Sequence, residues 1–131
     1  MPTTYELWWF LAFGYPITVA IETPVLLMGL SRPHPLTRRL LAGFWLTGCT
    51  YPIVVLVLPL LIWQPAGRMA YLIVAETFAP LAECGLFYAA FLRGGSPSGG
   101  QLVRDFAAIV LANLASFGII EVLRVAGWVQ W

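Results

Sequence analysis

Four glutamates lie inside segments that otherwise consist almost entirely of apolar residues. They are Glu22, Glu76, Glu83 and Glu121. Placing a carboxylate in the hydrocarbon of a bilayer costs at least roughly 2.5–3.5 kcal/mol. A protein tolerates this cost when the carboxyl group is protonated, hydrogen-bonded, paired with a cation or bound to a ligand. Acidic residues in such segments therefore indicate an ion or proton site, or a polar contact between helices.

The composition indicates an integral membrane protein. Of the 131 residues, 60% are hydrophobic and 10% are charged, and the mean hydropathy is +0.85. Soluble domains carry about 25% charged residues, so this chain has too little polar material for a water-facing surface. We expect an all-α protein, because helices satisfy their backbone hydrogen bonds within lipid. The net charge of +1 gives no reason to expect a nucleic-acid partner.

The apolar residues form four segments of bilayer-spanning length. Each contains the approximately 20 residues that a bilayer requires, and the segments cover about 7–30, 40–63, 69–92 and 102–128. We therefore expect a single domain, residues 1–131, folded as a bundle of four transmembrane helices.

The arginines predict the orientation of these helices. Five of the seven basic residues flank the loops at 31–39 and 93–104. Because basic residues are retained on the cytoplasmic side, we expect both loops in the cytoplasm and both termini outside, in a bacterial inner membrane. The predicted outer ends of the spans carry indole rings, which anchor at membrane interfaces. These are Trp8, Trp9, Trp63, Trp128 and Trp131.

The chain also has the pattern of a duplicated two-helix hairpin. Glu22 precedes Arg32, and Glu83 precedes Arg93, by the same ten positions. In the second helix of each half, residues 46–58 align with residues 111–123, at an offset of 65 positions. We therefore predict tandem repeats over 7–63 and 69–128, related by an axis along the membrane normal. Chance similarity between apolar helices is the alternative.

The spacing along the spans predicts an inner polar layer. At the helical rise of about 1.5 Å per residue, Glu22 and Glu83 lie about 15 Å from the cytoplasmic arginines, and Thr50 and Asn113 fall near the same depth. We predict that these four residues form an ion- or proton-binding site at mid-membrane. The alternative is that the acids are neutral and only hydrogen-bond to neighbouring helices, because burial favours the uncharged carboxyl group.

A second polar layer lies about 25 Å from the cytoplasmic arginines, near the outer interface. It contains Glu76, Glu121, Arg124 and Tyr15. Glu121 and Arg124 are three residues apart on one predicted helix and can form an ion pair. Glu76 is close enough to the surface to reach water. A structural role is therefore the simpler interpretation of this layer.

Cofactor and metal motifs are sparse. The single histidine, His34, lies between prolines in a loop, where we expect it to be solvated. One histidine excludes a bis-histidine haem within one chain, and neither a c-type haem motif nor a nucleotide-binding motif occurs, so any cofactor and the identity of any metal stay unknown. We expect Cys49 and Cys84 to be small buried residues, with a disulfide or a metal thiolate as the alternative.

Several short motifs resemble those of a loose group of small bacterial four-span membrane proteins. Members of that group carry Thr-x-Pro in the second span, paired glutamates in the third and Asn-x-x-Ser in the fourth. The corresponding residues here are Thr50 and Pro52, Glu76 and Glu83, and Asn113 and Ser116. Gly48 stands where the group tends to have a second asparagine. The resemblance implies an architecture and no particular chemistry.

Two functions fit these features best. The first is a permease or channel component that binds a cation or proton at Glu22 and Glu83, with Asn113 and Thr50 as neutral ligands. Because four helices leave little lumen, we expect a homodimer or other membrane subunits. The second is a non-catalytic subunit or assembly factor of a larger membrane complex. An enzyme acting on lipid or quinone, with a glutamate as general base, fits less well.

Overall fold

The structure, a computed structural model, describes residues 1–130, and every regular element in them is helical. The α-helices are α1 (Thr4–Gly29), α2 (Leu36–Pro52), α3 (Gln64–Phe87) and α4 (Gly99–Val125). Short π-helical segments extend α2 and α3, namely η1 (Ile53–Val57), η2 (Pro59–Trp63) and η3 (Tyr88–Leu92). The expectation of an all-α fold is confirmed for these residues. Trp131, which we predicted at the outer interface, lies outside the described residues.

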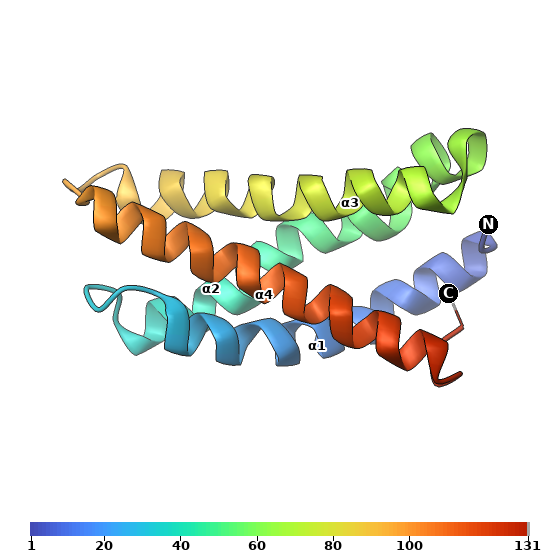
Figure 1. The fold of residues 1–131 in the computed structure, drawn as a ribbon, viewed down its shortest axis with the longest axis horizontal. Coiled ribbons are helices and arrows are strands. Elements are labelled where there is room, and N and C mark those ends of the chain that lie inside the picture. Colours follow the sequence, from blue (N-terminus) through green and yellow to red (C-terminus); the bar gives the residue numbers. More distant parts are fainter. Residues whose placement is uncertain (131) are drawn as a thin grey trace.

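Three helical stretches are long and apolar enough to cross a membrane, in agreement with an integral membrane protein. They are Thr4–Gly29, Leu36–Leu92 and Gly99–Val125. The middle stretch has 57 residues, far more than the approximately 20 that one crossing requires. Within it, Gly67 has a φ of 87°, which glycine adopts without strain. The chain reverses direction near the start of α3 (Figure 1), and the predicted connection at 64–68 coincides with this kink.

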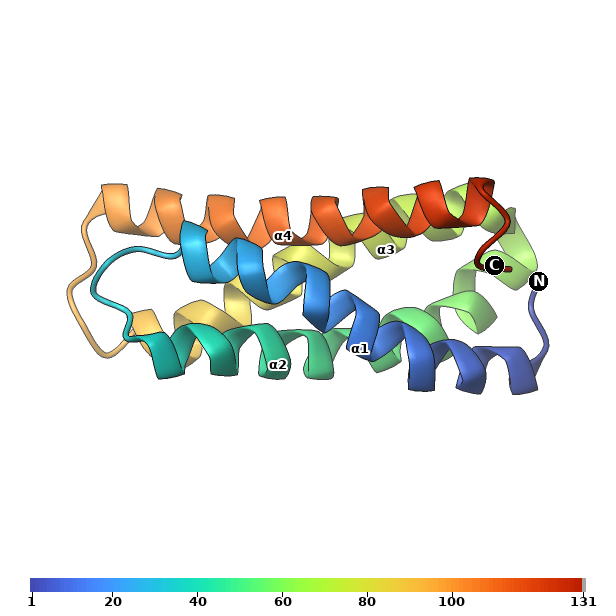
Figure 2. The same cartoon turned by 90° about the horizontal axis from the view of Figure 1, so that it is seen from below.

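The two ends of the molecule differ in what they contain. Both termini and the reversal of the chain near the start of α3 lie at one end, which we call the terminal end (Figures 1 and 2). The connections 30–35 and 93–98 lie at the other, which we call the loop end. Helix α1 packs against α2 and α4, and α3 packs against α2, η2 and α4.

Prolines explain where α2 changes its hydrogen-bonding pattern. Pro52 and Pro59 have no backbone N–H and cannot continue an α-helical ladder. After each of them the chain closes wider turns: the Leu58 N–H donates to the Ile53 carbonyl, five residues earlier. Wider turns of this kind rotate all later side chains about the helix axis.

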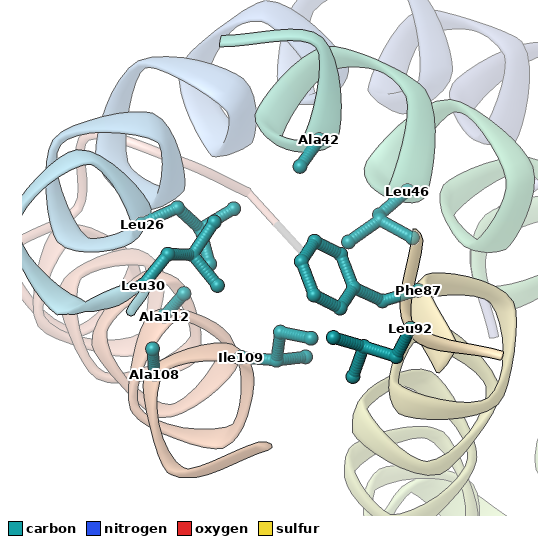
Figure 3. Close-up of a cluster of buried hydrophobic side chains, with 9 residues drawn as sticks. All are labelled: Leu26, Leu30, Ala42, Leu46, Phe87, Leu92, Ala108, Ile109 and Ala112. Atoms are coloured by element: carbon teal, nitrogen blue, oxygen red, sulfur yellow. The ribbon is translucent and has the colours of Figure 1, made fainter. Parts of the chain in front are cut away.

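The hydrophobic core is concentrated toward the loop end. Its buried members come from all four α-helices and η3 and surround the ring of Phe87 (Figure 3): Leu26, Leu30, Ala42, Leu46, Phe87, Leu92, Ala108, Ile109 and Ala112. Glycines permit the close approach of the helices here. A Cβ atom on Gly29 would lie 2.8 Å from the Ala108 side chain, and one on Gly43 would collide with Thr23. The loop half of the molecule is therefore tightly packed.

The outward-facing helix surfaces are apolar. Met28, Leu81, Val122 and Val125 are each at least 68% exposed. In water such a surface would be unfavourable, at roughly 25 cal/mol per Å² of apolar area. In a bilayer the same side chains meet hydrocarbon, as the composition predicts.

Candidate functional site

Glu22 and Glu83 are buried between the helices at the middle of the molecule. Glu22 lies on α1 and is 2% exposed, and Glu83 lies on α3 and is 3% exposed. Neither has an arginine, lysine or histidine within ion-pair distance among residues 1–130. Their burial therefore depends on hydrogen bonds from neutral groups.

Each carboxyl group receives two such bonds, one from α2 and one from α4. Thr47 donates its hydroxyl to Glu22 at 2.7 Å, and Ser116 donates to the other oxygen of Glu22 at 2.7 Å. Thr50 donates to Glu83 at 2.6 Å, and the Asn113 amide donates to its other oxygen at 2.7 Å. These six residues, which we call the carboxylate network, link all four α-helices.

The structure thus brings together all four residues of the predicted inner layer. It adds Thr47 and Ser116 as direct partners of Glu22. Ser116 lies three residues after Asn113 on the same helix face, and the two belong to the Asn-x-x-Ser motif noted in the sequence. Whether the network binds an ion or a proton stays a prediction.

The hydroxyl groups of the network each have two possible acceptors. Besides its glutamate, Thr47 lies 2.9 Å from the Gly43 carbonyl, Thr50 lies 3.2 Å from that of Leu46, and Ser116 lies 2.9 Å from that of Asn113. A hydroxyl has one hydrogen to donate and can also accept. It can donate to an ionised glutamate. It can also accept from a protonated glutamate while it donates to the carbonyl. Either protonation state therefore leaves every polar group paired.

The bonds of the network follow an exchange pattern between the two halves of the chain. Glu22 and Glu83 are 61 positions apart, and the donor pairs Thr47/Thr50 and Asn113/Ser116 are 66 positions apart. In each pair the first residue bonds the glutamate of its own half and the second bonds the glutamate of the other half. The offset of 66 differs by one from the predicted alignment of 65. One position matters, because it rotates a side chain by about 100° around a helix.

Above the carboxylate network lies a cavity of about 550 Å³. Both glutamates contribute to its lining, which extends to exposed Tyr5 and Glu6 and to Gln130 at the terminal end. The cavity therefore connects the buried carboxyl groups with the surface of that end. Residues of all four α-helices and of η1 line this space within one chain.

The predicted outer layer divides into three separate arrangements. Glu121 pairs with Arg124, as predicted, and also with Arg68, at 2.9 Å and 2.6 Å. Glu76 lines the cavity and forms no side-chain hydrogen bond or ion pair with the other described residues. Tyr15 is not part of this layer's polar contacts, because its hydroxyl donates to the Phe44 carbonyl of α2 at 2.7 Å.

A further polar cluster at the loop end was missed by sequence reasoning. Asp105, on α4, is fully buried and accepts hydrogen bonds from the Ser31 backbone N–H at 2.7 Å and from the Ser31 hydroxyl at 3.1 Å. His34 Nε2 lies 2.8 Å from the same carboxyl group. The expectation of a solvated His34 is wrong: its ring is 2% exposed and packs edge-on against Phe87.

Two arginines complete this end of the molecule. Arg39 donates to the carbonyls of Leu27, Ser31 and His34, and Arg104 donates to that of Gly29. The last carbonyls of α1 have no intrahelical partner, and these guanidinium groups supply one. In a sequence, an acidic residue next to a basic one near the start of a helix usually indicates an exposed, charged surface. Asp105 follows Arg104, so the sequence alone did not indicate that Asp105 is buried.

The sulfur and carboxylate groups form no obvious metal centre. Among residues 1–130, no three His, Cys, Asp or Glu side chains gather closely enough to hold a metal ion. Cys49 and Cys84 are free and half-buried. Comparisons with protein families, with curated proteins and with solved structures find no match to this chain.

Proposed function

We propose that this protein is a small membrane permease or channel component that takes up and releases protons at Glu22 and Glu83. The observation that carries the proposal is the two-acceptor geometry of Thr47, Thr50 and Ser116. Because it accommodates both states of each glutamate, protonation costs no hydrogen bond. The cavity above gives the glutamates a route to the terminal end.

A proton fits this site better than a metal cation. Both oxygens of each glutamate already accept a hydrogen bond, which leaves few lone pairs for a metal. Hard cations such as Ca²⁺ take six to eight oxygen ligands, and within residues 1–130 no three His, Cys, Asp or Glu side chains gather closely enough to hold a metal ion. Small cations are nevertheless included in the test below.

The arrangement in the membrane is part of the proposal. We infer that Leu36–Leu92 crosses the bilayer twice, because the chain reverses direction near the start of α3, which gives four spans in total. The arginine distribution supports a cytoplasmic loop end and external termini in a bacterial inner membrane. The exchange pattern of the carboxylate network supports a duplicated hairpin, with its repeats over 7–63 and 69–128. Association with a second copy or with other subunits stays a prediction.

A non-catalytic subunit or assembly factor is the second candidate. One observation favours it: both buried glutamates are fully hydrogen-bonded within the chain. A network of this kind can serve only to hold helices together. The two candidates differ in what happens when a glutamate loses its ability to ionise.

The deciding experiment is flux into proteoliposomes under an imposed gradient of H⁺, Na⁺ or K⁺. We expect the wild type to dissipate the proton gradient and the double variant Glu22→Gln/Glu83→Gln to behave like empty liposomes. Glutamine keeps the size and hydrogen bonding of glutamate but cannot ionise. Thr77→Val is the matched control, since Thr77 bonds only the Ile73 carbonyl on an exposed face. Wild-type flux equal to that of empty liposomes for all three ions, or unchanged flux in the double variant, would contradict the proposal.

A further inference from the structure

The cavity above the carboxylate network carries acidic groups and no basic ones. Its lining contains Glu6, Glu22, Glu76, Glu83 and Glu121, and no arginine, lysine or histidine among residues 1–130. The charge of Glu121 is balanced by Arg68 and Arg124. The Glu76 carboxylate has no such partner in the described chain. A cavity of this polarity favours a cationic occupant and disfavours an anionic one.

The walls between these acids are largely aromatic. Toward the terminal end they include Trp9, Phe10, Phe13, Tyr71, Phe117 and Trp128. The face of an aromatic ring attracts a cation, and clusters of such rings recognise quaternary ammonium groups. Aromatic walls do not supply the oxygen ligands that a bound hard metal ion needs. The lining therefore points to a cation that also carries apolar groups.

The size of the cavity and the hydroxyl groups in its wall agree with a molecular ligand. A volume of about 550 Å³ falls within the range of roughly 300–1,000 Å³ that small-molecule sites occupy. Thr18 lines the cavity one turn before Glu22 and is 4% exposed. The Tyr51 phenol, which also lines the cavity, is close enough to interact with the Thr18 hydroxyl. An occupant of the cavity would therefore meet two neighbouring hydroxyl groups on this wall.

We propose that the cavity binds a monovalent lipophilic organic cation, of the quaternary ammonium or phosphonium class, with Glu76 as its counter-charge. The aromatic residues surround the apolar groups of the cation, and the Glu76 carboxylate balances its charge within a space of low polarity. This inference rests on the proposed function, because it names the substrate that the proton site at Glu22 and Glu83 would serve. Its test is nevertheless a binding measurement that needs no flux.

The test compares two probes of nearly equal size and opposite charge, tetraphenylphosphonium and tetraphenylborate. Binding to purified full-length protein is followed through tryptophan fluorescence, since Trp9 and Trp128 line the cavity. We expect saturable binding of tetraphenylphosphonium, with tetraphenylborate at least about tenfold weaker. Glu76→Gln should weaken the cation by about tenfold or more, equivalent to roughly 1.4 kcal/mol. Thr77→Val, at the next position on the exposed face, should leave its affinity unchanged.

Several outcomes would overturn this inference. They are non-saturable binding, equal affinity for the two probes, wild-type affinity in Glu76→Gln, and a copurified phospholipid that prevents cation binding. If Glu76→Gln does not fold, Ala79→Trp tests the location, because Ala79 lines the cavity and an indole there should abolish binding. Proton flux without cation binding would remove this inference and leave the proposed function intact. Cation binding without proton flux would contradict the proposed function and leave the cation-binding site intact.

Discussion

Thr50 and Glu83 lie 33 positions apart in the sequence, and their side-chain oxygens are 2.6 Å apart in the interior of the protein. Thr47, one turn earlier on the same helix, bonds Glu22 instead. Helix α2 therefore contacts the glutamates of both α1 and α3 through two hydroxyl groups. Helix α4 likewise contacts both glutamates, through the Asn113 amide and the Ser116 hydroxyl. The four helices are joined at one depth by polar contacts that each bridge two of them.

The first prediction concerns the contribution of this contact to stability. Thr50→Val keeps the shape of the side chain but removes the donor to Glu83. We expect the free energy of unfolding to fall by about 1–3 kcal/mol, because a buried carboxyl oxygen loses its partner. Thr77→Val removes a hydroxyl that bonds only its own helix. This variant should change the free energy of unfolding by less than about 0.5 kcal/mol. Unfolding in mixed micelles measures both, and equal effects of the two variants would contradict this assignment.

The second prediction concerns the buried Asp105 at the loop end. Asp105→Ala leaves His34 and the Ser31 N–H without their shared acceptor. A buried polar group left without its partner costs about 1–3 kcal/mol, and because two residues lose their acceptor we expect the free energy of unfolding to fall by at least about 2 kcal/mol. Hydrogen exchange should rise specifically at the amides of Ser31 and His34. Arg93→Gln, an exposed change at the same end, is the control. Protection of these two amides that survives Asp105→Ala would refute the role of this carboxyl group.

The third prediction compares two glycines in helices. A Cβ atom at Gly43 would collide with the Thr23 side chain and lie 3.2 Å from its Cα, whereas one at Gly85 would meet nothing within 4 Å. We expect Gly43→Ala to destabilise the protein by about 1–3 kcal/mol through overpacking. Gly85→Ala should leave stability unchanged or raise it slightly, since alanine favours helix more than glycine does. Thermal unfolding of both variants tests this. A Gly43→Ala protein as stable as Gly85→Ala would mean that α1 and α2 do not approach closely here.

The depth of the polar residues could be predicted from the sequence, but their pairing could not. Because helical rise is constant, counting from the arginines placed Glu22, Glu83, Thr50 and Asn113 in one layer, and the structure brings them together. Which donor meets which glutamate depends on rotation about each helix axis. A change of one residue rotates a side chain by about 100°, so the predicted offset of 65 could not reveal the exchange at 66.

The contacts of side chains that reach a different depth in the membrane from that of their own backbone could not be predicted either. The Tyr15 ring extends to the Phe44 carbonyl, beside Gly48, where a Cβ atom would lie 3.2 Å from the Tyr15 hydroxyl. This provides a local reason for a glycine where the resembling group tends to have asparagine. His34 is buried because Asp105, 71 positions later, reaches it from another helix. Contacts of this range leave no local signal in a single sequence.

The last prediction concerns orientation, which we infer from arginine. Three of the loop-end arginines contact the chain itself: Arg39 and Arg104 bind carbonyls of the first loop and α1, and Arg38 stacks over Phe91. These contacts explain the positions of the three arginines without reference to a membrane.

The orientation of the helices in the membrane therefore needs a direct test. In a background with Cys49→Ala and Cys84→Ala, we expect Ser96→Cys in the second loop to resist a membrane-impermeant maleimide in intact cells and to react after lysis. Ser96 is exposed and suits this better than Ser98, whose hydroxyl caps α4. A cysteine at Thr4, near the N-terminus, should show the opposite pattern. Labelling of Ser96→Cys in intact cells, with protection at Thr4→Cys, would reverse the orientation and place the mouth of the cavity in the cytoplasm.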